Sequence, residues 1–328
     1  MSESSRALRR PDLPAGDVGA ALAAAGEFAP AAAELGHDSA VYLDTLRSLG
    51  AFDLTTARVI EPHLDALAIL AEAGLAPGDV LPGGGEGAWG VFAARAPQLR
   101  AVEEDGAWML DGVKPWCSLG QQLPHALVTA GTAQGQRLFA VDLTDARVSG
   151  AEDAWVSRGL AAIRSTSLTF DAMPAKPVGE PGFYLGRDGF AWGGIGVAAV
   201  WAGGVDGLVT AVREAAARRE PDQIALMHLG RLGVLTHVLD AVLADAARAI
   251  DCGNARGAAG LALSSRVRAV VADAVEQALT TAGHALGPGP LTSDEAYARR
   301  VADLGVYVRQ HHAERDLAAI GAATLERD

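Results

Sequence analysis

Two adjacent histidines near the C-terminal end, His311 and His312, have the side chains best suited to proton transfer, and Glu314 follows closely. An imidazole titrates near neutral pH, so it can accept a proton from a substrate hydroxyl or donate a hydrogen bond. Glu314 lies about one helical turn beyond His311 and could take over as the base if the local helix shifts. The alternative is that both histidines are ordinary helix residues, one facing outward and one packed.

Other polar groups do not match a known kind of site. His228, His237 and Asp240 could be imagined as metal ligands, but polar helix faces explain them, and no metal site is expected. The glycine-rich residues 83–87 are not followed by a Lys-Ser/Thr pair, so they do not form a phosphate loop. Ser118 is not part of a G-x-S-x-G turn, which argues against a hydrolase.

The composition indicates a globular protein of two or three domains. The chain has 328 residues, of which 50% are hydrophobic, enough to bury a large core. A net charge of −13 argues against a nucleic-acid partner, because phosphate binding needs clustered Lys and Arg. Cys117 and Cys252 lie far apart and form no CxxC pattern, which fits a reducing compartment and argues against structural zinc.

No segment of the sequence reads as a targeting signal or a membrane span. The first residues are polar and contain no apolar run followed by a cleavage site. The charge-free stretch 189–205 is short and rich in glycine, so we expect a packed core helix there. We therefore expect a cytoplasmic protein without a membrane partner.

The spacing of apolar residues predicts an N-terminal helical domain over residues 1–82. Residues 1–15 are expected to be a flexible tail. From residue 17 to about residue 75, apolar residues recur at intervals of three and four, which is typical of helices. The Gly- and Pro-rich stretch 74–87 is expected to be a linker or turn.

Residues 83–180 are predicted to form a middle domain of strands. Short apolar runs alternate with turn residues at a spacing of roughly ten residues, which is typical of a small β barrel or sandwich. The strands are expected to end near Met173-Pro174. The expected strands are residues 89–94, 107–110, 126–130, 137–142 and 167–170.

Residues 181–328 are predicted to form a four-helix bundle, which makes the fold class α+β. Each long helical segment is followed by Gly or Pro, which ends a helix. The expected helices are residues 206–219, 228–252, 258–286 and 293–323.

The segment from Trp108 to Ser118 resembles the "G-x-K-x-W-[IC]-[TS]" signature of the acyl-CoA dehydrogenases. In that family the tryptophan and the following hydroxyl residue lie beside the flavin ring. The resemblance therefore implies that Trp116, Cys117 and Ser118 line an FAD site, where a flat aromatic packs on the ring and nearby donors tune its redox state. Without the resemblance, Trp116 would be interpreted as a buried strand tryptophan after a tight turn.

A second segment, residues 159–174, resembles the "G-x-R-x-(S/T)" stretch and closing strand of the same family. This resemblance implies that Arg164, Ser165 and Thr166 also contribute to the flavin site. An exposed β turn is the alternative interpretation.

Two segments of the predicted bundle complete the resemblance. Residues 217–228 are similar to "E-R-x-x-F-G-x-x-(I/L)", which places Arg218 where the family's arginine reaches the FAD diphosphate of a partner subunit. A solvated helix end is the alternative for Arg218. Residues 277–289 are similar to "Q-x-x-G-G-x-G", with His284 in place of glutamine and Gly287 at a helix end that lets a phosphate approach the backbone.

The usual catalytic base of the family is missing. In the commonest form a glutamate follows the aspartate of an "R-D" pair by eight residues; Asp303 matches that aspartate, and His311 occupies the glutamate position. The second known location, around Val197-Ala198, has no acid. A branch of the superfamily that uses flavin and O₂ carries histidine in this part of the last helix. The resemblance thus makes His311, His312 and Glu314 the catalytic candidates.

The resemblance implies an FAD-dependent oxidoreductase, and the chain departs from the family in its shortened N-terminal helical domain. Its leading activity would be the α,β-dehydrogenation of an acyl-CoA or related thioester. A flavin monooxygenase that uses His311 and His312, or a non-catalytic relative, are the alternatives. The expected partners are the small-molecule substrate, an electron-transfer partner and further copies of the chain in a homodimer or homotetramer.

Overall fold

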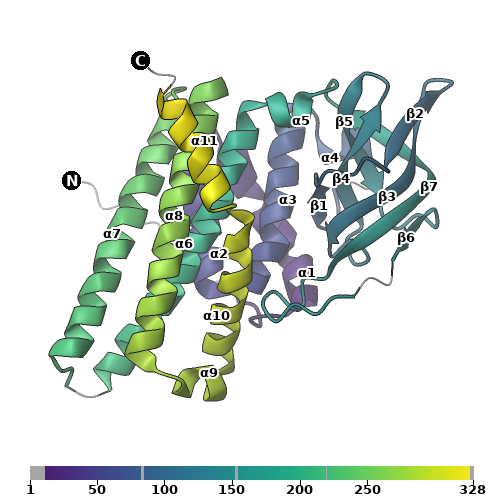
Figure 1. Ribbon diagram of the computed structural model, residues 1–328. Helices are drawn as coiled ribbons and strands as arrows, with labels where there is room; N and C mark the ends of the chain where they lie inside the picture. The colour runs from purple at the N-terminus through teal and green to yellow at the C-terminus, as the bar shows by residue number, and fades with distance from the viewer. Residues whose placement is uncertain (1–11, 83–84, 152–153, 219, 326–328) are drawn as a thin grey trace.

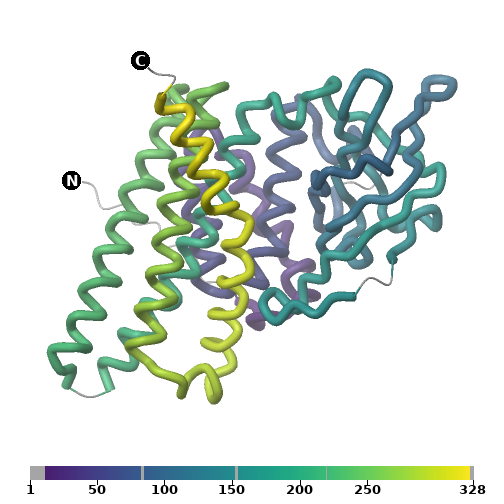
Figure 2. Tube along the Cα trace, viewed as in Figure 1, coloured from purple at the N-terminus to yellow at the C-terminus, as the bar shows by residue number. Residues whose placement is uncertain are grey.

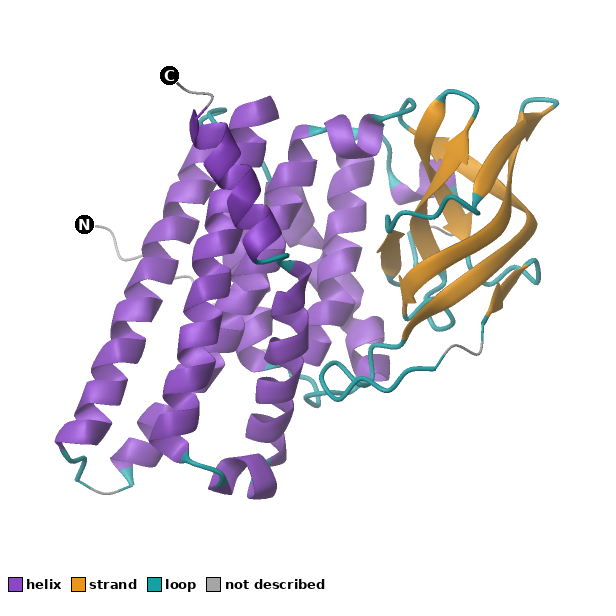
Figure 3. Ribbon diagram, in the orientation of Figure 1, coloured by secondary structure: helices purple, strands orange, loops and turns teal. Residues whose placement is uncertain are grey.

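The computed structural model describes residues 12–82, 85–151, 154–218 and 220–325. Helices, strands and helices again follow one another along the chain, in the order that the apolar spacing predicts. Figure 3 shows the strands gathered on one side of the molecule and the long helices on the other. Residues 1–11 of the expected tail and residues 83–84 of the expected linker lie outside the described residues. The domain limits at 82/83 and 180/181 stay predictions.

The N-terminal helices place one long helix, α3, between the strands and the bundle (Figure 1). Asp53 separates α2 from α3, and its carboxylate accepts a hydrogen bond from the backbone N–H of Thr56 at 2.8 Å. This N-cap starts α3 at a fixed point. The helices are α1 (Val18–Phe28), the 3-10 helix η1 (Ala29–Glu34), α2 (Ser39–Phe52), α3 (Leu54–Glu72) and α4 (Pro77–Val80).

The strands form one sheet that closes loosely into a small barrel. β5 pairs with β7 on one side and with β4 on the other, whereas β4 meets β2 only at Arg100 and Gly131. The expected end near Met173-Pro174 is wrong, because β7 continues to Val178. The strands are β1 (Trp89–Phe92), β2 (Arg100–Glu104), β3 (Ala107–Ser118), β4 (His125–Thr132), β5 (Gly135–Asp142), β6 (Val148–Gly150) and β7 (Ser165–Val178).

The C-terminal helices run side by side, as the tube in Figure 2 shows. The expected core helix 189–205 and the expected helix 206–219 are one continuous helix, which begins at Asp188 and ends at Ala217. The expected continuous helix 293–323 is wrong, because Tyr307 ends one helix and Ala313, with φ of 46°, precedes another. The helices are α5 (Phe183–Gly186), α6 (Asp188–Ala217), α7 (Gln223–Asp251), α8 (Gly257–Leu286), α9 (Gly289–Ser293), α10 (Glu295–Tyr307), the 3-10 helix η2 (Val308–Gln310) and α11 (Glu314–Leu325).

Two helices of the described part, α6 and α7, are long and apolar enough to cross a membrane by length and composition. In α6, 72% of the most apolar stretch is buried inside the protein, as expected for a core helix. In α7 only 22% of that stretch is buried, and Leu226, Met227 and Val234 are at least half exposed. The outer face of α7 is therefore an apolar surface.

The core helix α6 touches α2 at two glycines. A methyl group on Gly50 would meet the carbonyl oxygen of Val200, and a methyl group on Gly203 would meet the carbonyl oxygen of Arg47. Both obstacles are backbone atoms inside helices, so they cannot rotate away. The close contact between the two helices therefore requires glycine at both positions.

We expect Gly50→Ala to lower the free energy of unfolding by about 1–3 kcal/mol, because the two helices must move apart. Thermal unfolding followed by circular dichroism measures the change. Gly230→Ala in α7 is the control, since a methyl group there meets no atom within 4 Å. It should leave stability unchanged or raise it by up to about 1 kcal/mol. An unchanged Tm in Gly50→Ala would contradict the described contact.

Candidate functional site

A cavity of about 520 Å³ lies where α3, α6, α8 and the segment after α10 meet. Val91 of β1 also lines it, so the cavity extends to the strands. Its wall holds many charged and titratable side chains, which are rarely buried without partners. They are Arg58, Glu61, Asp65, Tyr184, Arg187, Arg268, His311, His312 and Asp316.

The two histidines expected to be chemically active both line this cavity. The side chain of His311 is 8% exposed, and its Nε2 lies 3.9 Å from the carboxylate of Asp316. Burial lowers the pKa of His311, although Asp316 opposes that shift. His312 is more exposed, and its Nδ1 lies 3.3 Å from the same carboxylate.

The histidines lie in a break between helices and not within one helix as predicted. The side chain of Asp316 accepts a hydrogen bond from the backbone N–H of His312 at 2.9 Å, which holds the turn. Because Ala313 has a left-handed backbone, no helical turn joins His311 to Glu314. Glu314 starts α11, is exposed, and is not among the described residues that line the cavity.

The long strands β3 and β7 bring together the residues expected at the flavin site. Their register pairs Ser118 with Ser165 and Cys117 with Thr166. The hydroxyl oxygens of Ser118 and Ser165 lie 2.8 Å apart, which is a hydrogen bond. Cys117 and Thr166 are buried in the barrel, whereas Arg164 is exposed. The hydroxyl groups of the two serines are therefore the polar side-chain groups at this point of the strand pair.

Trp116 lies on a bulge that turns its side chain outward. The pairing of β3 with β7 shifts register between Lys114 and Cys117, and Trp116 has φ of 62°. Its indole is 66% exposed, so the interpretation as a buried strand tryptophan is wrong. Trp116 is not among the described residues that line the large cavity. Its indole nevertheless offers a flat aromatic surface two residues before Ser118.

The buried side chain of Lys114 holds the start of this bulge in place. Its side chain is fully buried, and its Nζ donates hydrogen bonds to the carbonyl oxygen and to Oγ1 of Thr129 at 2.7 and 2.8 Å. Thr129 belongs to β4, on the other side of the barrel from β7. The lysine therefore joins the strand that carries Trp116 to the strand opposite.

Arg58 of α3 connects the cavity to the strand that ends at Ser118. Its Nη2 donates a hydrogen bond to Oγ of Ser118 at 3.3 Å, and its Nη1 donates to Oε2 of Glu61 at 3.3 Å. Arg58 and Val91 line both the large cavity and a smaller hollow that reaches Ser118. The cavity and the end of β3 therefore adjoin.

Two acidic residues of α3 belong to the cavity, and the sequence analysis missed them. Glu61 is 8% exposed, and its Oε2 accepts a hydrogen bond from the hydroxyl of Tyr307 at 3.2 Å. Burial raises the pKa of Glu61, and Arg58 opposes the rise. Burial also raises the pKa of Asp65, which pairs with Arg187 at 3.4 Å. The available signal was a set of charges at helical spacing within an apolar stretch.

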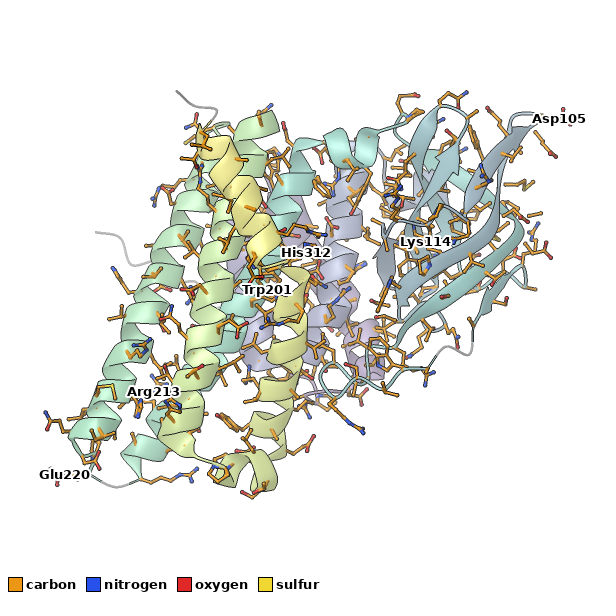
Figure 4. All side chains as sticks on the ribbon, viewed as in Figure 1. Asp105, Lys114, Trp201, Arg213, Glu220 and His312 are labelled. Carbon is orange, nitrogen blue, oxygen red and sulfur yellow. The ribbon has the colours of Figure 1, made fainter. Side chains whose placement is uncertain are left out.

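The remaining residues implied by the resemblance lie at another end of the bundle. Arg218 follows α6 and lines a separate hollow of about 390 Å³. His284 is exposed in the last turn of α8, and Gly287 ends that helix with φ of 65°. Figure 4 shows Glu220, two residues after Arg218, far along the bundle from His312. One chain therefore does not bring this group to the cavity.

No family model matches the sequence, and no curated protein matches it significantly. Solved structures do match. Butyryl-CoA dehydrogenase from Megasphaera elsdenii has a TM-score of 0.74 over 93% of this chain and 87% of its own, at 18% identity. Dibenzothiophene monooxygenase from Paenibacillus sp. A11-2 has a TM-score of 0.75 over 94% and 97%, at 16% identity. The chain has the acyl-CoA dehydrogenase fold.

Other structures with the acyl-CoA dehydrogenase fold were obtained with flavins. A glutaryl-CoA dehydrogenase from Mycobacterium smegmatis in complex with FADH2 has a TM-score of 0.75 over 93% of this chain and 89% of its own, at 16% identity. The Paenibacillus enzyme was also solved with FMN and indole. The fold predicted from the resemblance is confirmed. Because both dehydrogenases and a monooxygenase have it, the fold does not choose the reaction.

Proposed function

We propose that this chain is an FAD-dependent oxidoreductase that dehydrogenates the α,β bond of an acyl-CoA or related thioester. One observation carries the proposal. The cavity of about 520 Å³, with its buried proton-transfer groups, adjoins through Arg58 the strand that presents Ser118 and the exposed Trp116. The flavins bound by structures of the same fold support the choice of cofactor.

The side chains at the end of β3 fit a flavin chemically. Ser118 and Ser165 supply hydroxyl groups, Trp116 supplies an aromatic face, and Arg58 supplies a cation close to the hydroxyls. These are groups that can hold a planar heterocycle and stabilise extra negative charge on it. When bound, the flavin supplies two-electron redox chemistry, and the protein supplies positioning, proton transfer and exclusion of water.

An anaerobic experiment tests the proposed function. The purified chain is incubated with FAD, and the bound flavin is measured by absorbance after gel filtration. Saturated acyl-CoA thioesters are then added without O₂, and bleaching of the flavin is expected. A chain that takes up no FAD would contradict the proposal and favour the third interpretation, a non-catalytic relative.

Flavin monooxygenation is the second candidate, and the position of the histidines favours it. His311 and His312 both line the cavity, where a neutral imidazole can take a proton from a substrate hydroxyl or donate a hydrogen bond. Under this alternative, acyl-CoA would not bleach the flavin. Externally reduced flavin and O₂ would instead give an oxygenated product, detected by mass spectrometry with ¹⁸O₂.

We expect Trp116→Ala to weaken flavin binding by about 3- to 10-fold without loss of stability. The indole is 66% exposed, so its removal leaves no cavity in the core. Quenching of flavin fluorescence on titration with protein measures the affinity. Val102→Ala removes another exposed apolar side chain of the same barrel and should not change it. Equal affinities in the two variants would show that the ring does not contact Trp116.

We further propose that the chain works as a homodimer or homotetramer in the cytoplasm. The exposed apolar residues of α7 support an assembly, because such a surface is normally covered. A second copy is also needed if Arg218, His284 and Gly287 are to contact a flavin. An acyl-CoA dehydrogenation needs an electron-transfer partner to reoxidise the flavin. Light scattering with Met227→Glu tests the assembly, and a monomeric wild-type protein would contradict it.

A further inference from the structure

Two hydrogen bonds converge on the carboxyl group of Glu61, and a third continues from one of the donors to Ser118. Tyr307, at the end of α10, donates its hydroxyl to Oε2 at 3.2 Å. Arg58, one turn earlier on α3, donates to the same oxygen at 3.3 Å. The other terminal nitrogen of Arg58 donates to the hydroxyl of Ser118 at 3.3 Å. A continuous polar chain thus runs from the bundle, through Glu61, to the strand proposed to hold the flavin.

Glu61 faces the cavity and is almost closed to bulk solvent, at 8% exposure. Burial raises its pKa, and Arg58, Tyr307 and Arg268 oppose the rise. A carboxylate in such surroundings is a stronger base near neutral pH than an ordinary glutamate. The titratable and charged groups of the described residues that act on it are Arg58 and Asp65 of α3, Tyr307 of α10, Arg268 of α8, Tyr42 of α2 and Tyr184 of α5.

The other carboxyl groups of the cavity wall have different partners. Asp65 binds Arg187, whose guanidinium also binds Glu72. Asp316 faces the two histidines and accepts the backbone N–H of His312. Among the described residues, no arginine hydrogen-bonds both one of these two carboxyl groups and Ser118, as Arg58 does for Glu61. Among these carboxyl groups, Glu61 is therefore the one tied to the strand of the flavin site.

We propose that Glu61, on the N-terminal helix α3, is the catalytic residue that accepts the α-proton of the substrate. This role rests on the proposed dehydrogenation. The α-proton moves to an oxygen of Glu61 as H⁺, and the electron pair of the broken Cα–H bond forms the new Cα=Cβ bond. The β-hydrogen leaves with its electron pair to FAD, the oxidant. Tyr307 and Arg58 act as positioning residues that hold the carboxylate in place.

The test compares two identical substitutions on α3 in the FAD-loaded protein. Butyryl-CoA, glutaryl-CoA and palmitoyl-CoA serve as thioester probes in anaerobic stopped-flow measurements of flavin bleaching. Glu61→Gln should lower the bleaching rate by about 10²- to 10⁴-fold and leave the Kd of the thioester unchanged. Glu72→Gln removes a carboxylate that binds Arg187 and does not line the cavity, so it should keep the wild-type rate.

A second measurement reads Glu61 directly and needs no turnover. Infrared difference spectra of the folded protein should show a protonated carboxyl band that titrates above the usual range for glutamate and is missing in Glu61→Gln. Tyr307→Phe keeps the ring but removes the hydroxyl, so the band should titrate at still higher pH. A band that is identical in wild type and Glu61→Gln would overturn the proposal.

The outcomes separate the two levels of inference. If the wild type takes up FAD but none of the thioesters bleaches it, the proposed dehydrogenation fails, and the role of Glu61 fails with it. If the wild type is bleached and Glu61→Gln keeps its rate, only the role of Glu61 fails. A large loss of rate in His311→Asn in that case would assign the proton transfer to His311.

Discussion

Replacing Arg187 with methionine is expected to lower the free energy of unfolding by about 3–5 kcal/mol. The guanidinium is 2% exposed, and it binds Asp65 at 3.4 Å and Glu72 at 3.1 Å. Methionine fills a similar volume but leaves the carboxylate of Asp65 buried without its cation. Burial already raises the pKa of Asp65, and removal of Arg187 should raise it further. The loss therefore comes mainly from an uncompensated buried charge.

Calorimetry measures this loss as a fall in Tm, which we expect to be about 6 °C or more. Arg248→Met is the matched control, because Arg248 pairs with Asp245 where both side chains are 70% exposed. That change should alter stability by less than about 0.5 kcal/mol. Adding Asp65→Asn to Arg187→Met should restore part of the loss. Equal Tm values for the two single variants would show that the buried pair contributes nothing.

Lys114 is expected to make a large contribution to the pH dependence of the protein's stability. Burial lowers the pKa of this lysine to about 8 from its ordinary 10.5. Between these two values the unfolded chain binds a proton on Lys114 that the folded chain does not bind. Stability must therefore rise with pH across this window and fall again as the pH drops toward 8. The gain is on the order of 3 kcal/mol over the whole window.

Unfolding curves of the wild type and of Lys114→Met, recorded from about pH 7 to pH 10, isolate this effect. The difference in stability between the two proteins should grow in favour of the wild type as the pH rises, because methionine has no proton to lose. Lys176→Met changes an exposed lysine on the neighbouring strand β7 and should run parallel to the wild type. If Lys114→Met also runs parallel, the lysine is not desolvated in the folded protein.

The sequence predicted the order of the elements because that order depends on local patterns. Alternation of apolar and turn residues located β4 and β5, and the Gly or Pro after each long helical segment marked where α7 and α8 end. The break after α10 could not be foreseen in the same way. Its left-handed residue is Ala313, and neither glycine nor proline marks that position.

Part of the candidate site was predictable only through the resemblance, and part was not predictable at all. The signature pointed to Ser118, but the contact of its hydroxyl with Ser165 follows from the register of two strands. Glu61 was missed because its significance comes from Tyr307, which lies 246 residues away in the chain. Spacing within one helix cannot show which distant side chain will meet it.

Arg58 couples the proposed flavin position at Ser118 to the protonation of Glu61. One guanidinium serves both the hydroxyl of Ser118 and the carboxylate of Glu61. A ring bound at Ser118 that attracts this cation must change the proton affinity of Glu61. By thermodynamic reciprocity, protonation of Glu61 must then change the affinity for the ring by the same factor. The affinity for the cofactor and the uptake of a proton by Glu61 therefore both depend on the charge of the Arg58 guanidinium.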